Sequence, residues 1–177
     1  MSVIVRSLGS GSSGNALVIE TRGGSVLVDC GLSVAAINRG IRPSGRTVDT
    51  LSAVLISHEH VDHVRGLQRV LKNGALMVAT PGTHRALDAG KSAYLPLRPD
   101  ETIDVSGMLT ARALGVAHDA AEPCGFCIDV AGVRVTVITD LGSADDGLVE
   151  WIGSSDLIVL EANHDEEMLR RGPYPAH

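Results

Sequence analysis

The chain has 177 residues and a mass of 18.5 kDa, and 44% of its residues are hydrophobic, so it is long enough to bury a core as one globular domain. Its formal charge of −6 excludes a general attraction to nucleic acid, although it leaves room for a local basic patch. An odd count of three cysteines, no apolar leader and no apolar run of membrane-spanning length favour a cytoplasmic protein without a membrane partner.

The first half of the chain predicts short apolar strands with helices between them. We expect strands over 3–8, 16–20, 25–30, 51–57 and 75–79. Helices are expected over 33–40, over 64–73 and from 81 to about 90, because apolar residues repeat there at helical spacing or because a cap or proline opens the segment. Residues 39–50 read as a loop that carries Arg39, Arg42 and Arg46.

The second half predicts strands over 102–105, 109–116, 125–130, 133–139 and 157–160. Helices are expected over 148–152 and 165–171. The chain has no repeat of solenoid length. Strands with interspersed helices indicate a layered α/β fold.

A metal-ligand signature follows the apolar run 51–56. It reads His58-Glu59-His60-Val61-Asp62-His63 and places three of the seven histidines within six residues. Imidazole and carboxylate suit zinc, manganese or iron, and the absence of thiolates argues against a structural zinc finger. The alternative interpretation is a solvated polar turn.

Four expected strands end in residues that can bind or orient a metal: Asp29, His58 after Ser57, His118 and Asp140. Ligands often gather at the carboxyl ends of strands in layered α/β folds. If these ends converge, one site holds His58, His60, Asp62, His63, His118 and Asp140. That set exceeds the needs of one zinc ion and indicates two metals. The alternatives are a loop histidine at 118 and a capping aspartate at 140.

Other candidates have weaker signals. We expect Asp29 to orient a ligand histidine or a loop amide, with a simple turn role equally open. Ser12, Ser13 and Asn15 of the Gly/Ser loop 9–15 can offer donors to a phosphate, unless that loop is only a linker. His164 follows a strand end and can line the site. The thiols of the 124–127 CxxC would lie on opposite faces of a strand, which favours core positions over a metal site.

The HEHVDH string, with Asp29, His118 and Asp140, resembles the metallo-β-lactamase fold hydrolases. The strings SLGSGSSGNALVIE, LVDCG, SHEHVDHVRGL, VITDLG and LIVLEANHDEEMLRRGPYP are similar to the YycJ/WalJ subgroup. This resemblance implies an αββα sandwich of two mixed sheets with outer helices. It also implies that His58, His60 and His118 hold the first of two divalent metals. Asp62 and His63 would hold the second, with Asp140 as the bridge.

Members of the subgroup continue beyond the PYP string, and a later Gly-His-Leu-Ser segment supplies a last histidine to the second metal. This sequence ends at His177. We therefore expect a single domain over 1–177 whose second half is C-terminally incomplete. The second metal would be weakly held, or a substitute such as His164 would complete its site.

We expect a dinuclear metal-dependent hydrolase that uses a metal-activated water, with Asp62 orienting that water or carrying its proton. The resemblance implies a phosphodiesterase, with DNA exonuclease activity attributed to some members, so DNA is favoured over RNA as the substrate. Few aromatic residues and negative charge speak against a nucleic acid, whereas cations near the HEHVDH string speak for it. The alternatives are a small-molecule hydrolase, acting on a cyclic phosphodiester, lactone or thioester, and a catalytically weak metal-binding scaffold.

Overall fold

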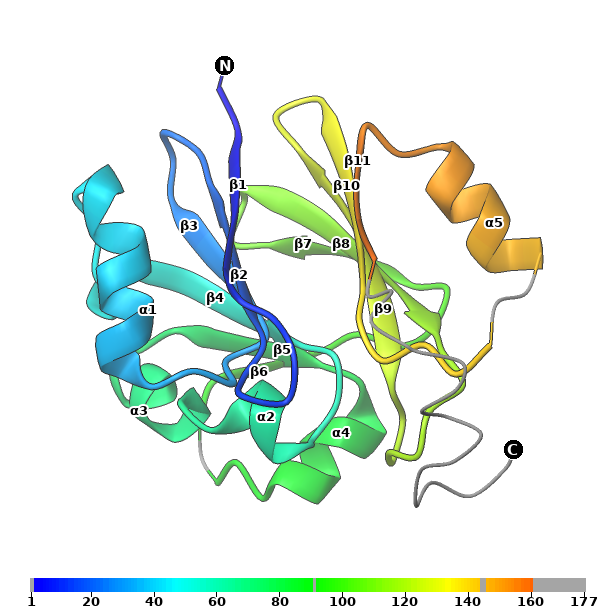
Figure 1. The fold of residues 1–177 in the computed structure, drawn as a ribbon, viewed down its shortest axis with the longest axis horizontal. Coiled ribbons are helices and arrows are strands. Elements are labelled where there is room, and N and C mark those ends of the chain that lie inside the picture. Colours follow the sequence, from blue (N-terminus) through cyan, green and yellow to red (C-terminus); the bar gives the residue numbers. More distant parts are fainter. Residues whose placement is uncertain (1, 91, 144–145, 161–177) are drawn as a thin grey trace.

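The computed structural model describes residues 2–90, 92–143 and 146–160. Two β-sheets lie face to face, with helices on the outer side of each sheet (Figure 1). This αββα sandwich of two mixed sheets confirms the fold class expected from the sequence.

The first sheet has six strands in the order β1-β2-β3-β4-β5-β6. Their bounds are Ile4–Gly9, Ala16–Glu20, Ser25–Val28, Leu51–Ile56, Leu76–Ala79 and Tyr94–Pro96. The strands β1, β2 and β3 pair in antiparallel fashion, and β3 to β6 run parallel to one another. The carboxyl ends of β3, β4 and β5 therefore meet at one edge of the sheet.

The second sheet has five strands in the order β11-β10-β9-β8-β7. Their bounds, from β7 to β11, are Thr102–Val105, Leu109–Gly115, Cys124–Val130, Val133–Ile138 and Leu157–Leu160. The strands β7 to β10 are antiparallel, whereas β11 is parallel to β10.

Helices α1 to α4 lie on the outer side of the first sheet, and α5 lies on the outer side of the second (Figure 1). Their bounds are Val34–Ile41, Val61–Val64, Leu67–Lys72, Pro81–Leu87 and Asp146–Gly153. Two short 3-10 helices, Arg42–Ser44 and Val48–Thr50, replace part of the loop expected over 39–50. None of the helices in the described ranges is long and apolar enough to cross a membrane.

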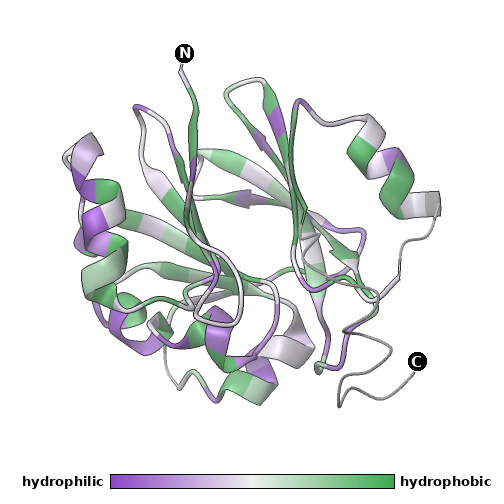
Figure 2. Ribbon diagram, viewed as in Figure 1, coloured by the Kyte–Doolittle hydropathy of each residue, from purple (hydrophilic) through white to green (hydrophobic). Residues whose placement is uncertain are grey.

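The core has two layers. One lies between the sheets, and the other lies between the first sheet and its helices. Because the first sheet is covered on both sides, all residues of β2 and β3 are buried, which explains why they read as continuous apolar runs. In β8, whose outer face is less covered, buried and half-buried residues alternate. Figure 2 shows the apolar residues concentrated between the layers.

The structure differs from the sequence expectations in a few elements. The short strand β6 was not expected. The single helix expected over 64–73 is divided into α2 and α3 at Gly66, whose amide donates to the Cys30 carbonyl at 2.8 Å. A Cβ atom on Gly66 would lie 2.4 Å from the Leu32 carbonyl oxygen, so only glycine allows this close approach. The helix expected over 165–171, together with His164 and His177, lies outside the described residues.

Candidate metal centre

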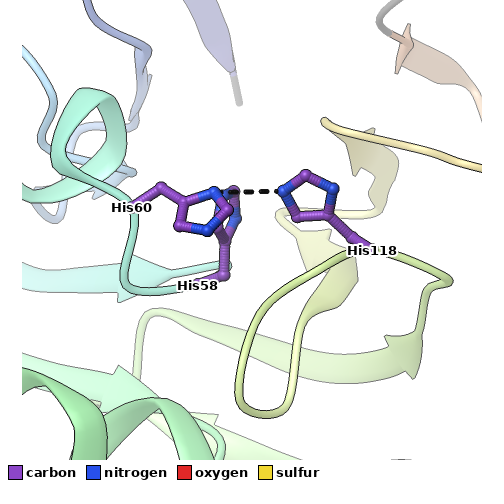
Figure 3. A group of neighbouring side chains, drawn as sticks. All are labelled: His58, His60 and His118. Carbon is purple, nitrogen blue, oxygen red and sulfur yellow. Dashed lines mark hydrogen bonds between the residues drawn. The ribbon is translucent and has the colours of Figure 1, made fainter. Parts of the chain in front are cut away.

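Three histidines from the two halves of the sandwich lie side by side (Figure 3). His58 and His60 follow β4, and His118 lies in the loop after β8. The Nε2 atom of His118 is 3.2 Å from the Nδ1 atom of His60. One nitrogen from each ring lies within 4.8 Å of the others. The structure therefore brings together three of the predicted ligands, which are as far as 60 residues apart in the sequence.

The chemistry of His58 fits a metal ligand. Its ring is buried, its Nδ1 atom lies 3.0 Å from the Ser57 hydroxyl, and its Nε2 atom makes no hydrogen bond within the described part of the chain. Burial and the positive charge of His63 lower the pKa of His58 to about 4. The ring is thus neutral at physiological pH, and its buried lone pair faces two other imidazoles. Such a set fits a divalent cation of the zinc type.

A second group combines His58 and His63 with Asp140, again with ligand atoms within 4.8 Å of one another. The Oδ2 atom of Asp140 is 2.7 Å from His63 Nε2 and 3.5 Å from His58 Nε2, so this carboxylate lies between the two groups. Asp62 lies at the edge of the second group, with its Oδ2 atom 3.7 Å from His63 Nε2. All six predicted ligands therefore meet in one place, while their roles as ligands stay a prediction.

Asp29 holds the inner side of this arrangement. Its carboxylate is buried and accepts hydrogen bonds from the Ser57 amide and hydroxyl, both at 2.9 Å. The Nδ1 atom of His63 is 2.9 Å from its other oxygen. Burial alone would lower the pKa of His63, but hydrogen bonds to Asp140 and Asp29 and their negative charges outweigh it and raise the pKa to about 10. A cation at this position would take the place of the proton between His63 and Asp140.

The backbone at the two strand-end aspartates is unusual. Asp29 has a φ angle of 57° and Asp140 one of 50°, both in the left-handed region. Residues other than glycine seldom adopt this region, although aspartate tolerates it better than most. In both cases the turn follows the last residues of a strand, β3 or β10.

Three loops meet at Gly31. The Asn15 amide donates to the Asp62 carbonyl at 2.7 Å, the Gly31 amide donates to the Asn15 carbonyl at 2.8 Å, and the Cys30 amide donates to the His63 carbonyl at 2.7 Å. A Cβ atom on Gly31 would lie only 1.5 Å from the Asp62 carbonyl oxygen. The absence of a side chain at Gly31 therefore lets the loops hold the backbone of Asp62 and His63 in place.

The Gly/Ser loop borders the centre, but its three candidate residues differ. Ser12 and Ser13 are exposed at its tip. Asn15 is buried, its Oδ1 atom accepts from the Gly11 amide at 2.8 Å, and its Nδ2 atom lies 2.9 Å from His63 Nε2. Asn15 thus lies against a candidate ligand, whereas the two serines remain candidates for phosphate contact.

The sequence interpretation missed Glu59 as a contributor. Its side chain crosses to the second half of the sandwich, where Oε1 accepts a hydrogen bond from the Ala121 amide at 2.7 Å. This bond joins the HEHVDH string to the loop that carries His118. The hydroxyl of Thr80 holds the same loop by donating to the Glu122 carbonyl at 2.7 Å. A carboxylate between two ligand histidines was visible in the sequence, but nothing there indicated its partner.

No cysteine belongs to either ligand group in the described part of the chain. Cys124 is buried, Cys127 is half-buried, and both thiols are free. Cys127 lines a hollow of about 360 Å³ beside Arg112 and Trp151 of α5. None of the predicted metal ligands lines that hollow, so the chemistry is concentrated at the histidine cluster.

Comparison with known proteins agrees with this geometry. A model described as the beta-lactamase superfamily domain matches residues 25–177. Exodeoxyribonuclease YycJ of Bacillus anthracis is 33% identical over 174 residues, covering 95% of this chain and 66% of the relative. Exodeoxyribonuclease WalJ of Streptococcus pneumoniae is 32% identical, covering 94% of this chain and 65% of the relative. The chain thus spans slightly less than two thirds of the length of these relatives.

Solved structures share the fold at low sequence identity. The short form of human tRNase Z superposes with a TM-score of 0.71 at 17% identity, covering 94% of this chain and 80% of that one. The metallo-beta-lactamase fold protein YhfI of Bacillus subtilis superposes with a TM-score of 0.70 at 18% identity, covering 87% of this chain and 68% of that one. At such identities the likeness concerns the fold alone.

Proposed function

Because this chain belongs to the beta-lactamase superfamily, we propose that it is a metal-dependent hydrolase of phosphodiester bonds with DNA as its substrate. The observation that carries the proposal is the convergence of His58, His60 and His118, with one ring nitrogen of each within 4.8 Å of the others. The names of the two exodeoxyribonuclease relatives support DNA as the substrate.

We propose two divalent cations per chain, zinc or manganese or iron. His58, His60 and His118 would hold the first, and Asp62 and His63 the second, with Asp140 shared between them. When bound, such cations stabilise negative charge on a phosphate and lower the pKa of a water molecule. The three free thiols support a cytoplasmic location for this chemistry.

The chain's own residues orient the reacting groups. The Asp29 carboxylate and the Ser57 hydroxyl hold the inner nitrogens of His63 and His58, so both rings keep their outer nitrogens toward the centre. Asp62 has a side chain that is 26% exposed, beside the buried ring of His63. Its carboxylate is thus open to a water molecule, which it can orient and from which it can accept a proton.

The test is hydrolysis by the metal-loaded protein of a single-stranded DNA, an RNA of the same sequence and bis-p-nitrophenyl phosphate. The variants His60→Ala and Asp62→Ala should lose at least about 100-fold in turnover while keeping the native circular dichroism spectrum. His84→Ala is the matched control, because His84 stacks on Tyr94 at 3.7 Å and belongs to neither ligand group. Unchanged turnover in either test variant would contradict the proposal. Cleavage of the RNA without cleavage of the DNA would show that RNA, and not DNA, is the substrate.

A further inference from the structure

Charge is distributed very unevenly along this chain. The segments 30–48 and 63–87 contain seven lysine and arginine residues and no aspartate or glutamate. Because the whole chain carries −6, all other residues together carry −13. These two segments form α1, α3 and α4 and contribute to α2, so seven of the fifteen lysine and arginine residues lie in or next to the helices that cover the first sheet (Figure 1).

Three of these cations lie in or just before α3. Arg69 and Lys72 are three residues apart in α3, which is the spacing of one helix face, Arg65 precedes the break at Gly66, and all three are exposed. The opposite face packs into the core through Leu67 and Val70. Figure 2 shows hydrophilic residues on the outer sides of these helices. We call Arg65, Arg69 and Lys72 the α3 row.

The charges of the α3 row are available for a partner. Within the described part of the chain, no carboxylate forms an ion pair with Arg69 or Lys72. Arg46 of the same layer differs, because it lies 3.7 Å from the carboxylate of Glu20 and donates to a backbone carbonyl. Arg69 and Lys72 therefore differ from the cations that join parts of the fold.

The α3 row begins at the candidate metal centre. Arg65 is two residues beyond His63, and its guanidinium donates to the carbonyl of Ser13 in the Gly/Ser loop at 2.8 Å. From there the row extends along α3, away from the carboxyl ends of β3 and β4. Arg39 and Arg42, at the end of α1, are exposed cations of the same layer.

We infer that the α3 row binds the phosphate backbone of the DNA whose scissile bond lies at the metal centre. The three exposed cations lie within eight residues of the chain, so they can contact neighbouring phosphates of one DNA strand. The row would thus hold the strand on one side of the cleaved bond without reading its sequence. This inference deepens the proposed function and rests on it for the identity of the polyanion.

The experiment compares two double variants of the metal-loaded protein that lose the same charge. Arg69→Gln/Lys72→Gln removes two cations of the row but leaves the Arg65 contact with the loop. Arg22→Gln/Arg98→Gln, the matched control, removes two exposed cations that lie outside the basic segments. Binding of a fluorescent single-stranded DNA with cleavage-resistant phosphorothioate linkages is measured by anisotropy between 50 and 200 mM salt, and hydrolysis is measured separately.

Each lost phosphate contact should reduce the slope of log affinity against log salt by about 0.7. When the salt rises fourfold, the factor by which DNA affinity falls should therefore be about sevenfold smaller for the test variant than for the unaltered protein. The control variant should keep the full salt dependence. Equal slopes in both variants, or no DNA binding at all, would overturn the inference. So would row-dependent binding to phosphatidylserine vesicles without binding to DNA. If the unaltered protein does not hydrolyse DNA but the salt slope of DNA binding still depends on the α3 row, only the proposed function is contradicted.

Discussion

Replacement of Glu59 by alanine should weaken cation binding by the three-histidine group, although Glu59 is not among its ligands. The change removes the hydrogen bond of 2.7 Å from the Ala121 amide, which joins the HEHVDH string to the loop of His118. Because Ala121 is exposed, the bond should contribute an ordinary net stabilisation of about 0.5–1.5 kcal/mol. Thr80 and Gly142 also hold this loop, through the carbonyls of Glu122 and Ala117, so we do not expect complete loss of the site.

If the bond serves to position His118, that free energy corresponds to about 2- to 10-fold weaker cation affinity. Affinity would be measured by chelator competition with Zn²⁺ and by the visible spectrum of the Co²⁺-loaded protein, alongside the free energy of unfolding in urea. Glu59→Gln keeps an acceptor oxygen and should restore most of the affinity. A lower stability of Glu59→Ala with unchanged cation affinity and an unchanged Co²⁺ spectrum would refute the positioning role, because the bond would then stabilise only the fold.

Gly31, Asp29 and Cys30, which border the candidate metal centre, each give a further prediction. Gly31→Ala should displace the Asp62 backbone, since its Cβ atom would lie 1.5 Å from that carbonyl oxygen, and the metal content measured by mass spectrometry should fall even where the protein still folds. Asp29→Asn should weaken metal binding by about 10- to 100-fold, because its amide nitrogen cannot accept the proton of His63. Metal affinity would be measured by calorimetric titration, and an unchanged affinity would contradict this prediction. Burial raises the pKa of the Cys30 thiol to about 12, so iodoacetamide at pH 8 should leave Cys30 unmodified until urea unfolds the protein.

Much of the sandwich could be expected from local patterns. Strands β2 and β4 have bounds within one residue of the predicted segments, because apolar runs between turn residues bury themselves in any layered arrangement. Ser33 caps α1 through a hydrogen bond from the Ala36 amide, as its position before an apolar helix suggested. The break in the helix at Gly66 could not be expected, because it depends on a loop from another part of the chain.

The ligand candidates were visible in the sequence because the chemistry of metal binding requires rare residue types at short spacing, as in His58 to His63. The tertiary structure alone decided which atoms meet. It placed Asn15 against His63 rather than open to a substrate, and it joined Glu59 to the loop of His118. The local sequence gives residue type and spacing, whereas the approach of strand ends from two sheets depends on how the whole core packs. The same packing places seven of the fifteen lysine and arginine residues of this acidic chain in or next to the helices over the first sheet, beside the candidate metal centre.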